Sequence, residues 1–169
     1  HQLRQDACSL RDDLRDLQHI QAISARHERA VARGDRVALR EIDHAVAAML
    51  RAEIAESAHE VVQAKKEVRQ SKREVRSDRH ESRDNRRTGA SVPVRHDDRR
   101  DLRDDRRDLR DDRRDANLAM ERLESYQDIA GAWNRLSAEG DLERQGDLLL
   151  ALRRLASAEV AADRAEQRE

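Results

Sequence analysis

The chain has 169 residues, of which 42% are charged and 37% hydrophobic, with one Trp, one Tyr and no Phe. This composition excludes a broad aromatic core, and the balance of 35 basic against 36 acidic residues lacks the basic excess of nucleic-acid binders. Five glycines and one proline leave few turns, and no apolar run is long enough to span a membrane. We therefore predict an all-α chain of long helices that bury narrow aliphatic seams.

Three breaks divide the predicted helices. The pairs Gly34-Asp35 and Gly140-Asp141 predict helix–helix turns, because glycine ends a helix in the left-handed conformation and aspartate caps the next one. The third break is a predicted loop over 88–96, which contains the only proline. The predicted helices run over about 2–33, 35–87, 96–139 and from 141 onward.

An offset of 106 residues relates the two ends of the chain and indicates a duplicated helical hairpin. It matches Leu17 with Leu123, Gln21 with Gln127, Ile23 with Ile129, and one Gly-Asp pair with the other. Because the outer helices are shorter than the central ones, we predict an up-down four-helix bundle whose central helices extend as an antiparallel two-helix stalk. The predicted domains are a first hairpin over 1–67, the stalk over 68–106 and a second hairpin over 107–169.

Hydrophobic spacing assigns the core of the bundle. The first helix carries apolar residues at alternating four- and three-residue steps, at Leu3, Ala7, Leu10, Leu14 and Leu17. Tyr126 and Trp133 are seven residues apart and are predicted to be core residues on one helix face. Four of the five histidines outside the Glu-x-x-His pairs show no ligand spacing and are predicted on solvated or boundary faces: His19, His27, His80 and His96. Cys8 is the only cysteine, which excludes an internal disulfide, and it is predicted to point outward.

The tract 97–115 repeats every seven residues, with one Leu per repeat between an Arg flank and an Asp flank. The preceding helix shows the same plan along Val61, Val68 and Val75. A two-helix seam uses two positions of each heptad, and the Val and Leu lines occupy one of them. The second seam position is predicted to hold long cations whose stems pack inward: Lys65, Lys72, Arg79, Arg106 and Arg113. In an antiparallel pair, like flanks face each other, which predicts one basic and one acidic edge.

Two patterns suggest metal binding. On the acidic edge, carboxylates at three- and four-residue spacing could share a hard cation such as Ca²⁺ at weak, multiple sites: Asp98, Asp101, Asp105, Asp108 and Asp112. The simpler interpretation of this edge is a solvated rod, in which exposed ion pairs contribute about 0–1 kcal/mol each. Two Glu-x-x-His pairs, Glu41 with His44 and Glu56 with His59, match the ligand motif of ferritin-like bundles. Both pairs lie on one predicted helix, whereas such sites need two.

The heptads DDRRDLR-DDRRDLR-DDRRDAN, about 20 residues, resemble runs in exported Arg/Asp-heptad helical proteins of Gram-negative bacteria, a poorly characterised group. The resemblance implies a periplasmic or secreted location, with the cytoplasm as the alternative.

The sequence shows no nucleophile–base arrangement, no Gly-rich phosphate loop and no Cys-x-x-Cys, so we predict a non-enzyme. The favoured function is an interaction or scaffold protein whose charged stalk meets a protein partner or a second copy, with neither nucleic acid nor a membrane span. The alternatives are an envelope stress protein that binds Ca, Cu or Zn, and a ferritin-like di-metal protein. No cofactor is predicted beyond a weakly bound divalent cation.

Overall fold

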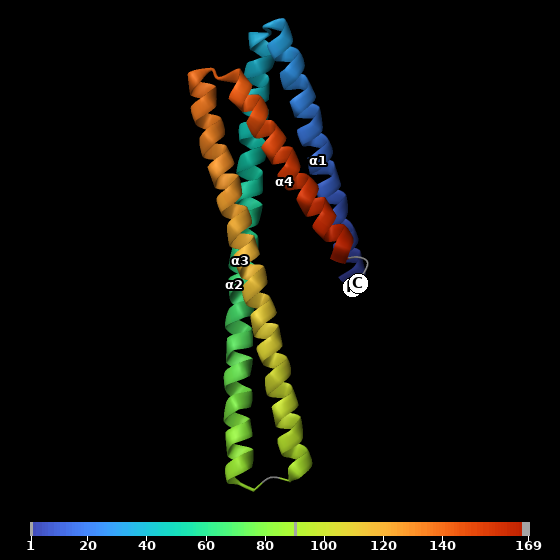
Figure 1. The fold of residues 1–169 in the computed structure, drawn as a ribbon, viewed down its shortest axis with the longest axis vertical. Coiled ribbons are helices and arrows are strands. Elements are labelled where there is room, and N and C mark those ends of the chain that lie inside the picture. Colours follow the sequence, from blue (N-terminus) through green and yellow to red (C-terminus); the bar gives the residue numbers. More distant parts are fainter. Residues whose placement is uncertain (1, 90, 167–169) are drawn as a thin grey trace. The chain divides into compact units, whose positions relative to one another are not determined.

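A computed structural model shows four helices in chain order over the residues that it describes (Figure 1). They are α1 (Gln2–Arg33), α2 (Arg36–Arg87), α3 (Val92–Glu139) and α4 (Leu142–Glu166). The structure describes residues 2–89 and 91–166, except for the side chains of residues 2–10, 12, 13, 159, 163 and 166. The prediction of an all-α chain is confirmed.

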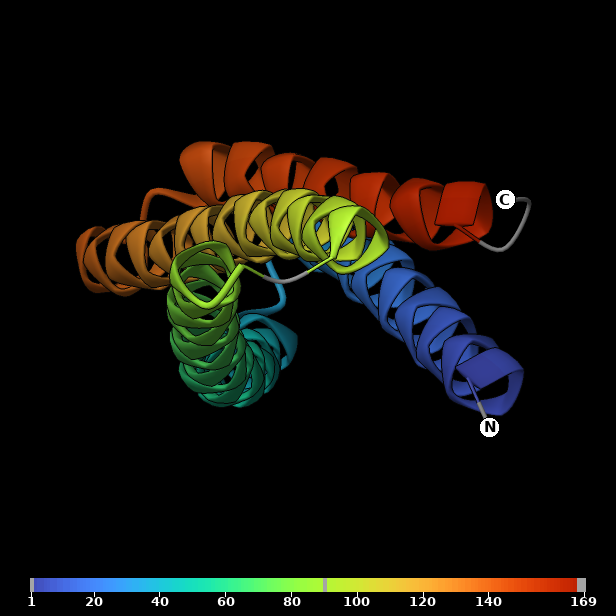
Figure 2. The same cartoon turned by 90° about the horizontal axis from the view of Figure 1, so that it is seen from below.

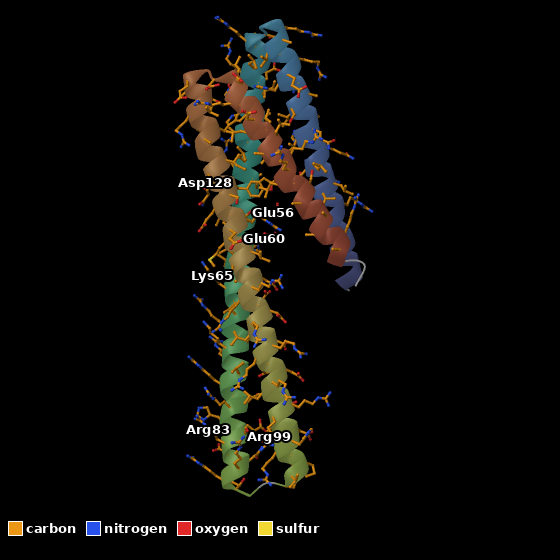
Figure 3. All side chains as sticks on the ribbon, viewed as in Figure 1. Glu56, Glu60, Lys65, Arg83, Arg99 and Asp128 are labelled. Carbon is orange, nitrogen blue, oxygen red and sulfur yellow. The ribbon has the colours of Figure 1, made fainter. Side chains whose placement is uncertain are left out.

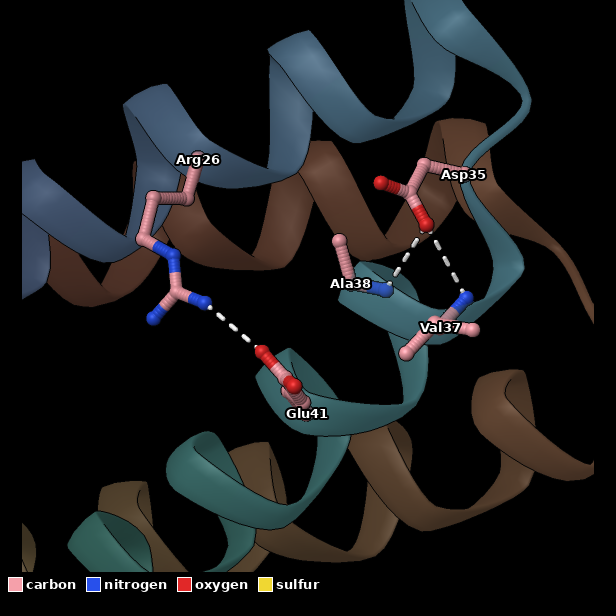
Figure 4. A network of polar contacts seen from close by, with 5 residues as sticks. All are labelled: Arg26, Asp35, Val37, Ala38 and Glu41. Carbon is pink, nitrogen blue, oxygen red and sulfur yellow. Dashed lines mark hydrogen bonds and ion pairs between the residues drawn. The ribbon is translucent and has the colours of Figure 1, made fainter.

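The two Gly-Asp turns form as predicted. Gly34 and Gly140 have φ values of 63° and 71°, in the left-handed region that favours glycine. In the first turn, Oδ1 of Asp35 accepts hydrogen bonds from the backbone N–H groups of Val37 and Ala38 at 3.1 and 3.0 Å (Figure 4). In the second, Oδ1 of Asp141 accepts from the backbone N–H of Arg144 at 3.1 Å. Each aspartate therefore satisfies N–H groups that the helix start leaves unpaired.

Removing the first cap should measurably weaken α2. We expect Asp35→Ala to lower the free energy of unfolding by about 0.5–2 kcal/mol, because two backbone N–H groups lose their acceptor. Asp35→Asn keeps an acceptor oxygen at the same place and should cost much less. Urea unfolding followed by circular dichroism measures both, and equal losses would contradict the capping role.

The predicted start of the third helix near His96 is wrong. Helix α3 begins at Val92, so the break between α2 and α3 is shorter than the predicted loop over 88–96. Pro93 lies in the first turn of α3, where its missing N–H removes no helical hydrogen bond and its fixed φ suits the helix. On the other side of the break, Gly89 has a φ of 72°.

The chain divides into two compact units. The first unit contains residues 1–52 and 127–169, and the second contains residues 53–126. The predicted domain boundaries, at 67 and 106, fall inside the second unit. Within the first unit, α1 contacts α4, and both Gly-Asp turns lie at the same end (Figure 1). Figure 2 views the second unit from its loop end, with its α2 part in green and its α3 part in yellow.

The core of the first unit is aliphatic around a single large ring. Trp133 is 2% exposed, as predicted for a core residue. Trp133 lies on α3, and the other three helices contribute smaller buried apolar side chains, at Ile20, Ile23, Ala30, Ile42, Val46, Leu50, Leu149, Leu152, Ala156 and Val160. Tyr126, also predicted as core, is buried in the second unit. The side chains of Leu3, Ala7, Cys8 and Leu10 lie outside the described residues.

Candidate functional site

The second unit is a pair of helices that we call the charged hairpin, residues 53–126, formed by the later part of α2 and the earlier part of α3. Contacts between its two helices fix their direction. Nη1 of Arg122 lies 3.2 Å from Oε2 of Glu60, and farther along α2 the Asn85 amide donates to Asp98 at 3.1 Å. Later residues of α2 therefore meet earlier residues of α3. Figure 3 shows their side chains, with Arg83 and Arg99 labelled near the loop end.

Burial along the charged hairpin identifies the seam. On α2 the less exposed positions alternate in steps of three and four: Val61, Ala64, Val68, Ser71, Val75, Asp78, Ser82 and Asn85. The same steps occur on α3, at Asp98, Leu102, Asp105, Leu109, Asp112 and Ala116. Each helix thus contributes the predicted aliphatic line together with a second line of small or acidic residues.

The prediction that long cations occupy this second line is wrong. All five predicted cations are exposed: Lys65, Lys72, Arg79, Arg106 and Arg113. The second line of a seam can lie either three or four residues after each Val or Leu of the first line. The predicted cations lie four residues after, and these positions face solvent. Serine, alanine, aspartate and asparagine occupy the other side, because short side chains fit between two closely packed helices and a buried cationic head would lose its hydration.

The second line forms what we call the polar ladder: Ser71 with Asp112, Asp78 with Asp105, and Asn85 with Asp98. Its members are seven residues apart on both helices. At one end the Ser71 hydroxyl donates to Oδ2 of Asp112, and at the other the Asn85 amide donates to both carboxylate oxygens of Asp98, at 3.1 and 3.2 Å. Two of the three ladder layers are therefore held by a neutral donor on α2 and a carboxylate on α3.

Negative charge concentrates around the middle layer. Burial raises the pKa of Asp105 to about 6, and the neighbouring carboxyl of Asp78 acts in the same direction. Glu74 on α2 and Asp108 on α3 contribute further negative charge to the same effect. Acidic side chains of both helices thus gather around the middle layer of the polar ladder.

Positive charge gathers elsewhere on the charged hairpin, around what we call the basic groove. The groove encloses about 240 Å³. Its cations come from both helices, with Lys65, Arg69 and Lys72 on α2 and Arg113 on α3. Its remaining lining is Val68, Ala116, Asn117 and Met120. Four cations therefore surround a largely apolar floor, an arrangement suited to a ligand that is both acidic and amphipathic.

The residues predicted to bind metal are spread over several environments. Three of the five aspartates, Asp98, Asp105 and Asp112, belong to the polar ladder, while Asp101 and Asp108 are exposed. In the first unit His44 is exposed, and Glu41 pairs with Arg26 at 3.1 Å (Figure 4). Glu56 and His59 are exposed residues of the second unit. The described residues contain no group of three or more His, Cys, Asp or Glu side chains arranged to hold a metal ion.

The first unit buries a polar network that the sequence pattern did not reveal. Gln145 on α4 is 2% exposed, and its amide donates to Oδ1 of Asp43 on α2 at 3.1 Å and to the Ser137 hydroxyl on α3 at 2.8 Å. Ser137 in turn donates to the same Asp43 oxygen at 2.7 Å. One carboxylate therefore links three helices.

His27 corrects a prediction. It was expected on a solvated or boundary face, like His19, but it is 3% exposed on α1, and its Nε2 has no hydrogen-bond partner among the described atoms. A Cβ added at Gly146 on α4 would lie 3.9 Å from Cε1 of His27, so the ring faces α4. The 106-residue offset pairs His27 with Trp133, whose Nε1 is likewise buried and unpartnered. Both rings are therefore buried in the core of the first unit.

Within the part of the chain that the structure describes, no helix is both long and apolar enough to cross a membrane. Comparisons with protein families, with curated proteins and with solved structures find no match to this chain.

Proposed function

We propose that this chain is a non-enzymatic interaction or scaffold protein of the bacterial envelope, whose charged hairpin binds an acidic amphipathic helix of a protein partner. The duplicated four-helix bundle with its antiparallel stalk belongs to the same proposal. The observation that carries the proposal is the basic groove, in which cations of both helices surround an apolar floor.

Charge and shape both favour such an occupant. A helix that carries Glu on one flank and Leu on the other could place its carboxylates beside Lys65, Arg69 and Lys72 while its apolar face covers Val68 and Met120. Exposed ion pairs contribute little alone, so affinity would depend on several of them acting around a desolvated apolar contact.

A binding measurement tests this proposal. The probe is a fluorescently labelled helical peptide of Glu and Leu, with Leu at three- and four-residue spacing, and binding is followed by anisotropy. The triple substitution Lys65→Glu, Arg69→Glu and Lys72→Glu should weaken binding by roughly tenfold or more, because it replaces three attractions with three repulsions. Affinity should also fall with added salt.

A matched control changes the same charge elsewhere on α2. Arg79, Arg83 and Arg86 are exposed and lie outside the basic groove, so their triple replacement by Glu should leave most of the affinity intact. Equal losses in the two triple variants would reject the groove. A single-stranded DNA 20-mer that bound through the same residues would reject a protein partner. A concentration-dependent dimer, seen by sedimentation and lost only in the groove variant, would replace the partner with a second copy.

A further inference from the structure

The middle layer of the polar ladder differs from its neighbours. In the outer layers a neutral group on α2 donates to an aspartate on α3, from Ser71 to Asp112 and from Asn85 to Asp98. In the middle layer α2 presents another carboxyl, Asp78, opposite Asp105. Two ionised carboxylates can only accept hydrogen bonds, so this layer lacks the donor that the other two possess.

A proton can supply the missing donor. Oδ2 of Asp105 is buried and has no hydrogen-bond partner among the described atoms, yet the Asp78 carboxyl lies within hydrogen-bonding reach of Asp105. A carboxylic acid facing a carboxylate forms a strong hydrogen bond, whereas two facing carboxylates repel each other. The layer is therefore complete with one proton and incomplete without it.

The charged surroundings strengthen this dependence. Glu74 faces the pair from α2 and Asp108 faces it from α3, and both disfavour ionisation of Asp105. The chain neighbours Arg79 and Arg106 are exposed, so their charges are screened by solvent. His80, two residues beyond Asp78, is exposed as well.

We propose that Asp78 and Asp105 form a proton-operated latch, which ties α2 to α3 in mildly acidic solution and loosens this part of the charged hairpin at neutral pH. The latch rests on the geometry of the ladder and is independent of what the basic groove binds. It would let acidification stiffen the charged hairpin without any ligand.

The sign of the pH effect follows from the folded and unfolded states. An unfolded aspartate has a pKa of about 3.9, whereas the pKa of Asp105 in the folded protein is raised to about 6. Between these values the folded state holds a proton that the unfolded state has lost, so stability falls as pH rises. The contribution is complete below the unfolded value and is lost as pH passes through about 6.

The test compares melting temperatures of the full chain from pH 4.5 to 7.5, measured by circular dichroism. The wild type should lose stability on the order of 5 °C across this range through the latch. Asp78→Asn places an amide donor opposite Asp105, as Asn85 does opposite Asp98. This variant should be more stable than the wild type at pH 7.5 and should lose the latch contribution to the pH profile. Asn85→Asp should create a second acid pair and steepen the profile.

Two further measurements separate the latch from other titrating groups. Asp104→Asn removes the same charge at an exposed position next to Asp105 and should leave the profile parallel to that of the wild type. The carboxyl carbon of Asp105, followed by NMR, should titrate near pH 6 in the wild type and at lower pH in Asp78→Asn. The latch is overturned if Asp78→Asn and wild type give parallel profiles, or if Asp105 titrates alike in both.

Discussion

Replacing Trp133 with alanine should lower the free energy of unfolding by about 3–5 kcal/mol, the largest loss we expect from any single substitution in the first unit. Trp133 is 2% exposed and is the only large aromatic side chain in a core of Ala, Val, Ile and Leu. A well-packed core closes only part of the space that the indole would leave, so the free energy lost with the burial is joined by the cost of a cavity.

Chemical unfolding followed by circular dichroism measures this loss, since the substitution removes the only tryptophan fluorophore. Val37→Ala serves as a control, because this side chain is 60% exposed and its truncation should change stability by no more than about 0.5 kcal/mol. Trp133→Phe keeps an aromatic ring and removes the buried, unpartnered Nε1–H, so it should cost much less than alanine. A Trp133→Ala variant as stable as the Val37→Ala control would contradict the assigned core.

The second large effect concerns the buried polar network of the first unit. Asp43→Ala should cost about 1–3 kcal/mol, because it removes the acceptor shared by Gln145 and Ser137 and leaves the buried Gln145 amide without that partner. Asp43→Asn retains an acceptor oxygen at the same position and should retain much of the stability. Urea titrations at pH 7 compare the two.

A double-mutant cycle shows whether the network acts as a unit. If Asp43 and Ser137 interact as the 2.7 Å hydrogen bond indicates, Asp43→Ala and Ser137→Ala should be non-additive by roughly 0.5–3 kcal/mol. Additive losses would mean that the two side chains contribute independently, and the network would not link α2 to α3.

Local rules made most of the helix boundaries predictable. The turns at Gly34 and Gly140 follow from the left-handed preference of glycine and the capping ability of the next residue, which depend on only a few neighbouring residues. The predicted start of α3 is too late because Pro93 favours loop structure in the sequence pattern, although proline also suits the first turn of a helix. Both readings are local, and only the fold decides between them.

The seam shows where periodicity stops being informative. The repeat of Val and Leu every seven residues identified one line of each helix correctly. The repeat does not indicate whether the second line of the seam lies three or four residues after each Val or Leu, because both positions flank the first line equally. The signal that could have decided was the size of the side chains, because Ser71, Asp78 and Asn85 recur every seven residues on α2 and are short enough for a narrow seam.

The burial of two polar residues in the first unit could not be predicted from hydrophobic periodicity. Gln145 and His27 are polar types that usually remain partly exposed, yet they are only 2% and 3% exposed. The 106-residue offset pairs His27 with the core residue Trp133 and so indicates that His27 is buried. No such signal exists for Gln145, because its hydrogen-bond partners lie on α2 and α3. The basic groove was anticipated only as an edge, because its apolar floor depends on how the two helices meet.

The seven-residue spacing of the polar ladder makes the length of the charged hairpin adjustable in fixed increments. Removing or adding one heptad on each helix near the loop would shift its end by about 10.5 Å while every remaining layer kept its partner. The same change on one helix alone would slide each carboxylate past its donor. A tandem run such as DDRRDLRDDRRDLR can therefore vary in copy number during evolution only when the opposite helix varies with it.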